Sequence, residues 1–211
     1  MKTELILEEL IERYPMLVGE KENVYKAFCT IRDSFVAGGR LYVCGNGGSA
    51  SDSEHIVGEL VKGFRLPRPL HKAFAEELKG YGELGEEMLN ALDGGMPAIS
   101  LCGHPSLSTA FSNDKNPLLT FAQQVSVYGR AGDVLITIST SGNSKNCVYA
   151  SIAAKALGMK VVFLGGGNGG KLKDYADVSI VVPEKETFKV QELHLPVYHC
   201  LCAMLENEFF G

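Results

Sequence analysis

Short apolar runs alternate along this sequence with longer stretches in which apolar and polar residues recur at helical spacing. The runs are rich in Val and Ile, which is typical of strands buried on both faces of a sheet. We predict strands at Arg40–Cys44, Pro97–Leu101, 133–138, Lys160–Leu164 and Val178–Val182. Because helical stretches separate these strands, the pattern predicts an α/β fold, a three-layer α-β-α sandwich around a central parallel five-stranded sheet of the flavodoxin or Rossmann kind.

Helical periodicity fills the segments before, between and after these strands. Helices are predicted at 3–14, 20–37, about 51–63, from 106, 116–129, 144–157 and 191–209. Residues 64–96 interrupt the rhythm with two prolines, five glycines and helical patches near 72–79 and 83–92. We interpret the chain as one domain over 1–211, with an N-terminal helical segment (1–38) and an insertion (64–96) folded over its ligand-binding side.

Composition narrows the class of protein. The 211 residues are 45% apolar and 21% charged, as in ordinary globular domains, and the net charge of −5 argues against a nucleic-acid partner. No apolar run approaches the roughly 18 residues of a membrane span. The six cysteines form no C-x-x-C pair, and the first residues run into a helical pattern instead of a secretory segment. We therefore expect reduced thiols and a cytoplasmic location.

Two loops of small and hydroxyl residues carry most of the functional information. Loop A, residues 44–49, reads Cys-Gly-Asn-Gly-Gly-Ser, and loop B, residues 139–144, reads Ser-Thr-Ser-Gly-Asn-Ser. Each lies between a predicted strand and a predicted helix, where free backbone N–H groups and the helix dipole favour an anion. In parallel sheets ligands bind beyond the carboxyl ends of the strands. The two loops together predict a ligand with a phosphate and further polar groups.

Two other segments have a structural explanation as well as a functional one. The glycine-rich run Gly165–Gly170 departs from the P-loop consensus because Leu172 follows Lys171, so we interpret it as a tight turn with positive φ angles. Asn113 and Asp114 end a predicted helix, where such residues are common, but they could also contact a sugar hydroxyl.

Acid–base candidates occur on two predicted helices. His55 and Glu59 are four residues apart and so lie on one helical face, where they could move protons, hold a metal or form a surface ion pair. The closing helix carries Gln191, His194 and His199 among apolar residues, where a histidine is commonly a core residue. Pro196 must either lie in the first turn of that helix or kink it.

Taken together, these segments resemble the sugar isomerase (SIS) domain family, and within it the branch that acts on heptose phosphates. The resemblance spans residue 20 to the end. It depends on the following motifs: Gly45–Ser49, His55-x-x-x-Glu59, Ser106-Leu107 to Asn113-Asp114, Gly132–Leu135, Ile138–Ser144, and Gln191-Glu192-x-His194 with His199 beyond.

The resemblance implies an aldose–ketose isomerase that converts sedoheptulose 7-phosphate to D-glycero-D-manno-heptose 7-phosphate through an enediol. Glu59 and His199 would be the acid–base pair. The implied substrate-binding residues are Asn46, Gly47, Gly48, Ser49, Asn113, Asp114, Ser139, Thr140, Ser141, Ser144 and Gln191. The family also implies a homotetramer with active sites at subunit contacts, and no nucleotide cofactor.

Zinc stays open as a cofactor. His55, Glu59, Gln191 and His199 match positions that bind Zn²⁺ in some members of the family. A straight helix, however, separates Gln191 and His199 by about 12 Å, so the two converge on one ion only if the chain bends, Gln191 precedes the regular helix, or a second subunit contributes.

Departures from the family pattern leave the substrate less certain than the reaction type. Lys189 replaces a frequent arginine and loses its bidentate fork, and Phe188 stands where some members have an aspartate. Two alternatives therefore remain. One is a non-catalytic SIS-fold protein that binds a phosphosugar or a replication initiator, which would have no physical need for both Glu59 and His199. The other is an isomerase, lyase or sensor for a different phosphosugar.

Overall fold

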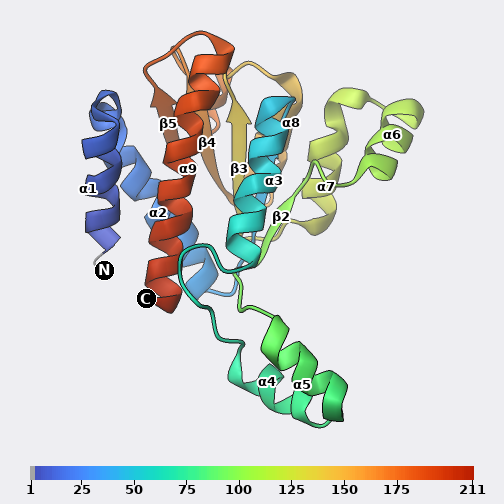
Figure 1. The fold of residues 1–211 in the computed structure, drawn as a ribbon. Coiled ribbons are helices and arrows are strands. Elements are labelled where there is room, and N and C mark those ends of the chain that lie inside the picture. Colours follow the sequence, from blue (N-terminus) through green and yellow to red (C-terminus); the bar gives the residue numbers. More distant parts are fainter. Residues whose placement is uncertain (1–2) are drawn as a thin grey trace.

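The computed structural model describes residues 3–211, which form a three-layer α-β-α sandwich. Its sheet has five strands, all parallel, in the order β2-β1-β3-β4-β5 (Figure 1). The strands are β1 (Leu41–Gly45), β2 (Ala98–Ser100), β3 (Val134–Ser139), β4 (Lys160–Gly166) and β5 (Val178–Val182). The predicted fold class and strand number are confirmed.

Two sets of helices cover the two faces of the sheet (Figure 1). One face packs against α1 (Thr3–Arg13), α2 (Lys21–Val36), α3 (Gly48–Val61) and α9 (Thr187–Phe210). The other packs against α7 (Thr120–Tyr128) and α8 (Lys145–Ala156), while α6 (Pro105–Asp114) has no buried residue. Short 3₁₀ turns lie at Pro15–Glu20, Pro117–Leu119 and Lys171–Asp174.

Strand β1 explains why both faces need cover. Leu41 and Val43 belong to the core on the α3 and α9 side, whereas Tyr42 and Cys44 belong to the core on the α7 and α8 side. All four are at most 1% exposed. Successive side chains of a strand point to opposite faces, so a strand between two helical layers must be apolar throughout. Each such side chain contributes roughly 1.5–3 kcal/mol by leaving water.

Helix α9 differs most from its predicted bounds. It begins at Thr187 instead of residue 191, which places Pro196 in the helix interior and not in its first turn. The helix is nevertheless continuous to Phe210, although Pro196 cannot donate a backbone hydrogen bond. Eleven of its residues are buried, so tertiary packing outweighs the local cost of the proline.

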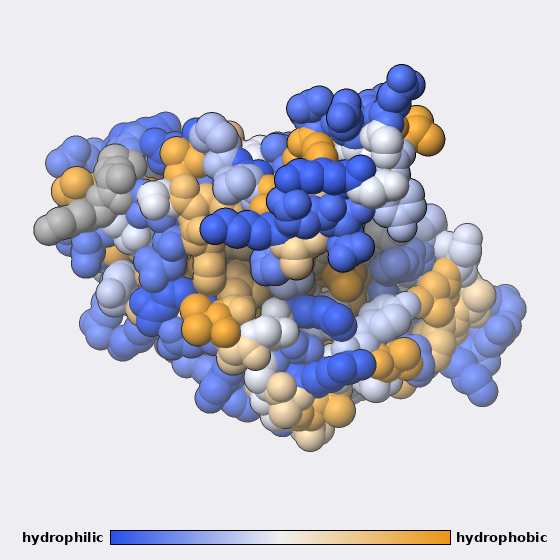
Figure 2. Space-filling view, turned by 90° about the horizontal axis from the view of Figure 1, so that it is seen from below, coloured by the Kyte–Doolittle hydropathy of each residue, from blue (hydrophilic) through white to orange (hydrophobic). Residues whose placement is uncertain are grey.

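The insertion forms a helical hairpin, α4 (Lys72–Lys79) and α5 (Gly82–Ala91), which we call the arm. The arm extends away from the body, beyond the end of α3, and does not fold over the carboxyl edge of the sheet in this chain (Figure 1). Its helices pack on each other, and Tyr81 and Leu84 stay more than 70% exposed. Seen from the arm's end, the surface is mostly hydrophilic with small apolar groups (Figure 2).

None of the six cysteines is paired in the structure: Cys29 and Cys102 are partly buried, and the other four are buried. Within residues 3–211 no helix combines the length and apolar character needed to cross a bilayer.

Candidate active site

The two small-residue loops lie next to each other at the carboxyl edge of the sheet. Loop A follows β1 and loop B follows β3, and these strands are neighbours. The chain runs from β1 outward to β2 and then returns to β3 on the other side of β1. This reversal is the topological switch point at which open parallel sheets bind ligands. The side-chain amides of Asn46 in loop A and Asn146 in the first turn of α8, which follows loop B, exchange two hydrogen bonds of 3.0 and 2.7 Å.

Loop A depends on glycine because other chain segments approach its backbone closely. A Cβ atom on Gly45 would lie 2.5 Å from the Ser49 carbonyl oxygen, and one on Gly48 would lie 2.6 Å from Nε2 of Gln191. Gly47 has a φ of +56° as it leads into α3. The side chain of Gln191, near the start of α9, therefore rests on the first turn of α3 beside loop A.

Loop B is held by its own side chains and by the glycine run. The hydroxyls of Ser139 and Ser144 lie 3.0 Å apart, and the backbone N–H of Asn143 donates to Oγ of Ser141 at 3.2 Å. Gly142 has a φ of +66°, and a Cβ there would lie 1.9 Å from the carbonyl oxygen of Gly169. Only two glycine-rich backbones can pack this closely.

Gly165 and Gly166 of the glycine run are the last residues of β4, and the remainder of the run is a turn, as predicted, with positive φ at Gly167, Gly169 and Gly170. It nevertheless borders the predicted phosphate site. A cavity of about 380 Å³ lies between loop B and this turn; its lining consists of Thr140, Ser141, Asn143, Gly166, Gly167, Asn168 and Lys185. The exposed Lys185 adds a cation to hydroxyl and backbone groups, a combination suited to a phosphate. Sequence reasoning missed Lys185 because a surface lysine carries no motif.

A second group of polar side chains lies between α3 and α9, and we call it the acid–base cluster: His55, Glu59 and His199. Nε2 of His55 lies 3.2 Å from Oε1 of Glu59 and 3.4 Å from Nε2 of His199. Burial, together with the neighbouring His55 ring, lowers the pKa of His199 below the usual 6.5. The predicted acid–base pair thus comes together from two helices far apart in sequence.

A buried ion pair fixes the end of α3 that carries Glu59. Arg68 donates to the backbone carbonyls of Glu59 and Leu60 at 2.8 and 2.7 Å and to the carboxylate of Glu206 at 2.8 Å. Both side chains are at most 1% exposed. Burial raises the pKa of Glu206, but bonds from the backbone N–H groups of Phe64, Arg65 and Leu66 and from Arg68 lower it overall. Nothing in the sequence marks this pair, because its members lie far apart in the chain.

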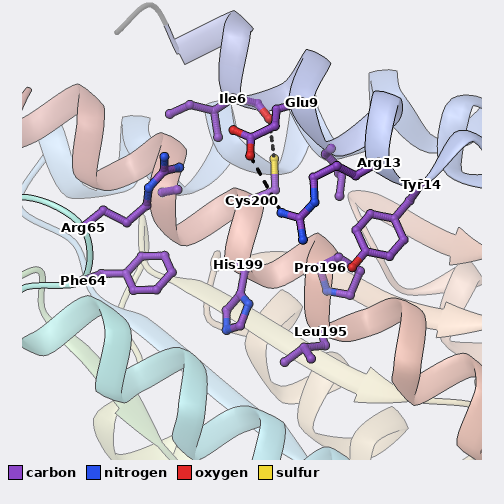
Figure 3. A pocket seen from close by; sticks show the side chains of 12 residues that line it. Ile6, Glu9, Arg13, Tyr14, Phe64, Arg65, Leu195, Pro196, His199 and Cys200 are labelled. Carbon is purple, nitrogen blue, oxygen red and sulfur yellow. Dashed lines mark hydrogen bonds and ion pairs between the residues drawn. The ribbon is translucent and has the colours of Figure 1, made fainter.

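The ring of His199 also faces a pocket between α9 and α1. Figure 3 shows the ring between Phe64 and Leu195, with Arg13 and Tyr14 reaching in from the N-terminal helix and the turn after it. The pocket has a volume of about 300 Å³ and includes a second arginine, Arg65. It is separate from the cavity at loop B, so one chain presents the two predicted halves of the site in different pockets.

Two groups of predicted residues are not brought together with the rest. Gln191 lies at loop A, about two helical turns from His199, so the four proposed zinc ligands do not converge in this chain. Among residues 3–211, no cluster of three or more His, Cys, Asp and Glu is arranged to hold a metal ion. Asn113 and Asp114 end the exposed helix α6, and Asn113 donates to Asp114 at 2.9 Å instead of to a loop residue.

His194 proves to be a core residue. It is fully buried, and its Nε2 lies 3.2 Å from the carbonyl oxygen of Gly165 at the start of the glycine run. Burial lowers its pKa to about 4, although the bond to Gly165 partly opposes this. His194 is therefore neutral at neutral pH and joins α9 to the end of β4, beside loop B.

Comparison with known proteins places this arrangement in context. A model of the SIS domain matches residues 8–85 and 95–166. A phosphoheptose isomerase from Leptospira biflexa is 39% identical over 189 residues, which are 90% of this chain and 85% of that protein. One from Helicobacter pylori is 40% identical over 189 residues, 90% of this chain and 83% of that protein. The phosphoheptose isomerase structure from Neisseria gonorrhoeae aligns with a TM-score of 0.73 at 30% identity, covering 97% of this chain and 93% of that one.

Proposed function

Because the chain belongs to the SIS domain family and phosphoheptose isomerases match it over most of its length, we propose that it converts sedoheptulose 7-phosphate into D-glycero-D-manno-heptose 7-phosphate. The chain is thus an aldose–ketose isomerase, an intramolecular oxidoreductase. The observation that carries the proposal is the convergence of Glu59 and His199 on His55 across the seam between α3 and α9.

Isomerisation moves one proton between carbons and others between oxygens. In our proposal the carboxylate of Glu59 removes a proton from C1 of the ketose while the imidazole of His199 supplies a proton to the C2 oxygen, which gives the enediol. Removal of the proton on the C1 oxygen and return of a proton to C2 then give the aldose. Each positioned acid or base contributes typically 10²–10⁴-fold to the rate.

Loop B would hold the phosphate at the far end of the substrate. Its hydroxyls and backbone N–H groups, with Lys185 beside them, offer donors without a competing carboxylate in the cavity. Binding energy gained at the phosphate can then be used to orient the reacting carbons, although the phosphate takes no part in the proton transfers. In this proposal Asn46 and Ser49 of loop A contact the sugar chain between the two ends, although Ser49 is 3% exposed and would reach it only from the floor of the site.

We further propose that the protein works as a homo-oligomer, in the family's case a tetramer. The cavity at loop B and the pocket at His199 are separate in one chain. In an oligomer, loop B of one copy would lie next to the acid–base cluster of a neighbouring copy, so that the two together form one complete site. Mixing Glu59→Gln with Ser141→Glu, whose carboxylate would repel the phosphate from loop B, tests this under subunit exchange. Two inactive parents regain activity in hybrids if the site is shared between chains, and they do not if the site lies within one chain. The six free thiols favour the predicted cytoplasmic location.

Zinc remains a prediction that the residues fit only in part. His55, Glu59 and His199 offer imidazole nitrogens and a carboxylate oxygen, which are donor types that Zn²⁺ accepts, but within residues 3–211 they are not arranged to hold an ion. Gln191 lies elsewhere in this chain. A bound zinc would polarise the substrate carbonyl. Our mechanism uses no step that depends on it.

The decisive experiment follows the C1 protons of sedoheptulose 7-phosphate by NMR in D₂O with the purified protein. We expect exchange of one C1 proton and appearance of the aldose signal, with shorter ketose phosphates reacting more slowly. A folded protein that binds the sugar phosphate without any exchange would support the non-catalytic alternative. Exchange only with a shorter ketose phosphate would move the assignment to a different phosphosugar.

A further inference from the structure

The acid–base cluster has a second layer of polar groups behind it. Tyr198, the residue before His199 on α9, places its hydroxyl oxygen 3.0 Å from Nδ1 of His55. The same oxygen lies 3.3 Å from Oδ1 of Asp52, one turn before His55 on α3. Asp52, Tyr198 and His55 therefore form a continuous hydrogen-bonded row that ends at the cluster.

The Tyr198 side chain is shielded from water, so its hydrogen bonds within this row cannot easily be replaced by bonds to solvent. Tyr198 is 2% exposed, and its ring meets the His55 ring edge to face with centroids 5.5 Å apart. The second carboxylate oxygen of Asp52 is buried and has no hydrogen-bond partner among the described residues. Burying a carboxylate is costly unless it accepts hydrogen bonds, so the bond from Tyr198 is the main compensation for Asp52.

The donor and acceptor inventory fixes the direction of the row. An ionised carboxylate only accepts, so the single hydroxyl proton of Tyr198 goes to Asp52. The tyrosine oxygen can then only accept from His55, which places a proton on Nδ1. Which nitrogen of a histidine carries the proton is set by the bond that the other nitrogen makes.

We propose that Tyr198 and Asp52 are positioning residues that hold a proton on Nδ1 of His55 and thereby aim its Nε2 at Glu59 and His199. The inference builds on the proposed function, because it gives the acid–base cluster its orientation. Neither residue reaches the substrate. A histidine at a functional site works with one nitrogen only when its other nitrogen is held in this way.

The two contacts at Nε2 bear on this assignment in opposite ways. The lone pair that the proposed tautomer leaves on Nε2 of His55 can accept from the Nε2–H of His199 at 3.4 Å. The carboxylate of Glu59, at 3.2 Å, is a competing acceptor that favours a proton on Nε2, so the proposal requires the bond to Tyr198 at Nδ1 to outweigh it. Without Tyr198, the carboxylate of Glu59 would be the strongest partner left and would draw the proton to Nε2. The tyrosine hydroxyl therefore decides the tautomer.

The test uses ¹⁵N NMR of histidine-labelled, chelator-treated protein at mildly alkaline pH, where imidazoles are neutral. In the unmodified protein we expect Nδ1 of His55 in the protonated range and Nε2 in the unprotonated range. In Tyr198→Phe, which keeps the ring, the two assignments should exchange. An unprotonated Nδ1 in the unmodified protein, or no exchange in the variant, would overturn the proposal.

Tyr42→Phe is the matched control. Tyr42 is also fully buried and its hydroxyl donates to the carbonyl of Tyr128 at 3.0 Å, away from the cluster. It should leave the His55 signals unchanged despite a comparable loss of stability. In activity assays Tyr198→Phe should lower kcat about 10–100-fold with little change in KM, whereas Tyr42→Phe should alter neither. Equal losses of kcat in both variants would reduce Tyr198 to a structural role.

The NMR measurement needs no substrate, so it separates this inference from the proposed function. If the protein shows the expected tautomer but no isomerase activity, the positioning role of Tyr198 and Asp52 stands and the proposed function is wrong. If it is active but shows the opposite tautomer, the proposed function stands and the positioning role is wrong.

Discussion

Loop B and the seam between α3 and α9 build their halves of the site in opposite ways. Loop B is shaped by its backbone: Gly142 packs against Gly169 so closely that no side chain fits between them. The seam is shaped by side chains, which meet across two helices at distances of 3.0–3.4 Å. Loop B, which binds through several backbone and hydroxyl groups, should tolerate the loss of one hydroxyl. The seam, in which each step of the reaction depends on a single side chain, should not tolerate the loss of any one of them.

The largest effect should come from the seam. Glu59→Gln keeps the size of the side chain and removes the base, so we expect kcat to fall by at least about 10²–10⁴-fold. Binding of the sugar phosphate, measured by calorimetry, should persist because loop B is untouched. Turnover that survives the substitution would remove Glu59 as the base and with it the contrast between the two halves.

The second prediction concerns His194, which joins α9 to the end of β4 beside loop B and should make the free energy of unfolding depend on pH. Its pKa is about 4 in the folded protein and about 6.5 when unfolded, so the unfolded state binds more protons between these values. Stability should therefore be full above pH 6.5 and fall as the pH drops towards 4, by roughly 3 kcal/mol in all. Urea unfolding of the intact protein and of His194→Gln, which can still reach the Gly165 carbonyl, checks this. An equal pH response in both would assign the loss to other groups.

Gly142→Ala tests the backbone character of loop B directly. A Cβ atom 1.9 Å from the Gly169 carbonyl, at a φ of +66°, should cost about 1–3 kcal/mol of stability and raise KM. Gly19→Ala is the control, because nothing lies within 4 Å of its Cβ position and its φ is not positive. Thermal unfolding and steady-state kinetics of both variants measure the difference. Similar melting temperatures for the two would show that the loop adapts.

The smallest effect should come from one hydroxyl of loop B. Ser141→Ala removes a single donor among several, so we expect KM to rise severalfold, in line with about 1 kcal/mol per hydrogen bond. The turnover number should stay within about twofold because Ser141 lies away from the reacting carbons. An unchanged KM would contradict the phosphate assignment, and a large fall in kcat would erase the distinction between binding and reacting halves.

The same contrast decides what the sequence could predict. The strand Val178–Val182 was predicted to the residue from its run of Val and Ile, although only Ile180 and Val182 are buried in it. The loops were predictable because glycine and serine between a strand and a helix leave few alternatives. The pairing of Glu59 with His199 was predicted through family resemblance, and the structure brings both to His55.

What the sequence missed depends on contacts between distant segments. Arg68 and Glu206 are 138 positions apart, and no local pattern identifies their buried ion pair. Tyr198 resembled one more apolar residue of a core helix until its hydroxyl was seen beside His55. The direction in which the arm extends could not be predicted either. Helices α4 and α5 pack mainly on each other, so their pattern of apolar residues contains no information about their orientation relative to the sheet.

The neck of the arm has a consequence for how this chain can change length. Two chain segments connect the arm to the body, residues 62–71 before α4 and 92–97 after α5, and together they form the neck. Backbone hydrogen bonds hold them close to each other and to the end of α3: the Gly94 N–H donates to the carbonyl of Arg68 at 2.8 Å, and the Met96 N–H to that of Leu60 at 2.9 Å. With its ends already closed, the segment between them is a detachable module, and the cost of trimming it to a short turn is mainly that of loop closure. Evolution or engineering could therefore add, shorten or replace this appendage while the chemistry between α3 and α9 continues unaltered.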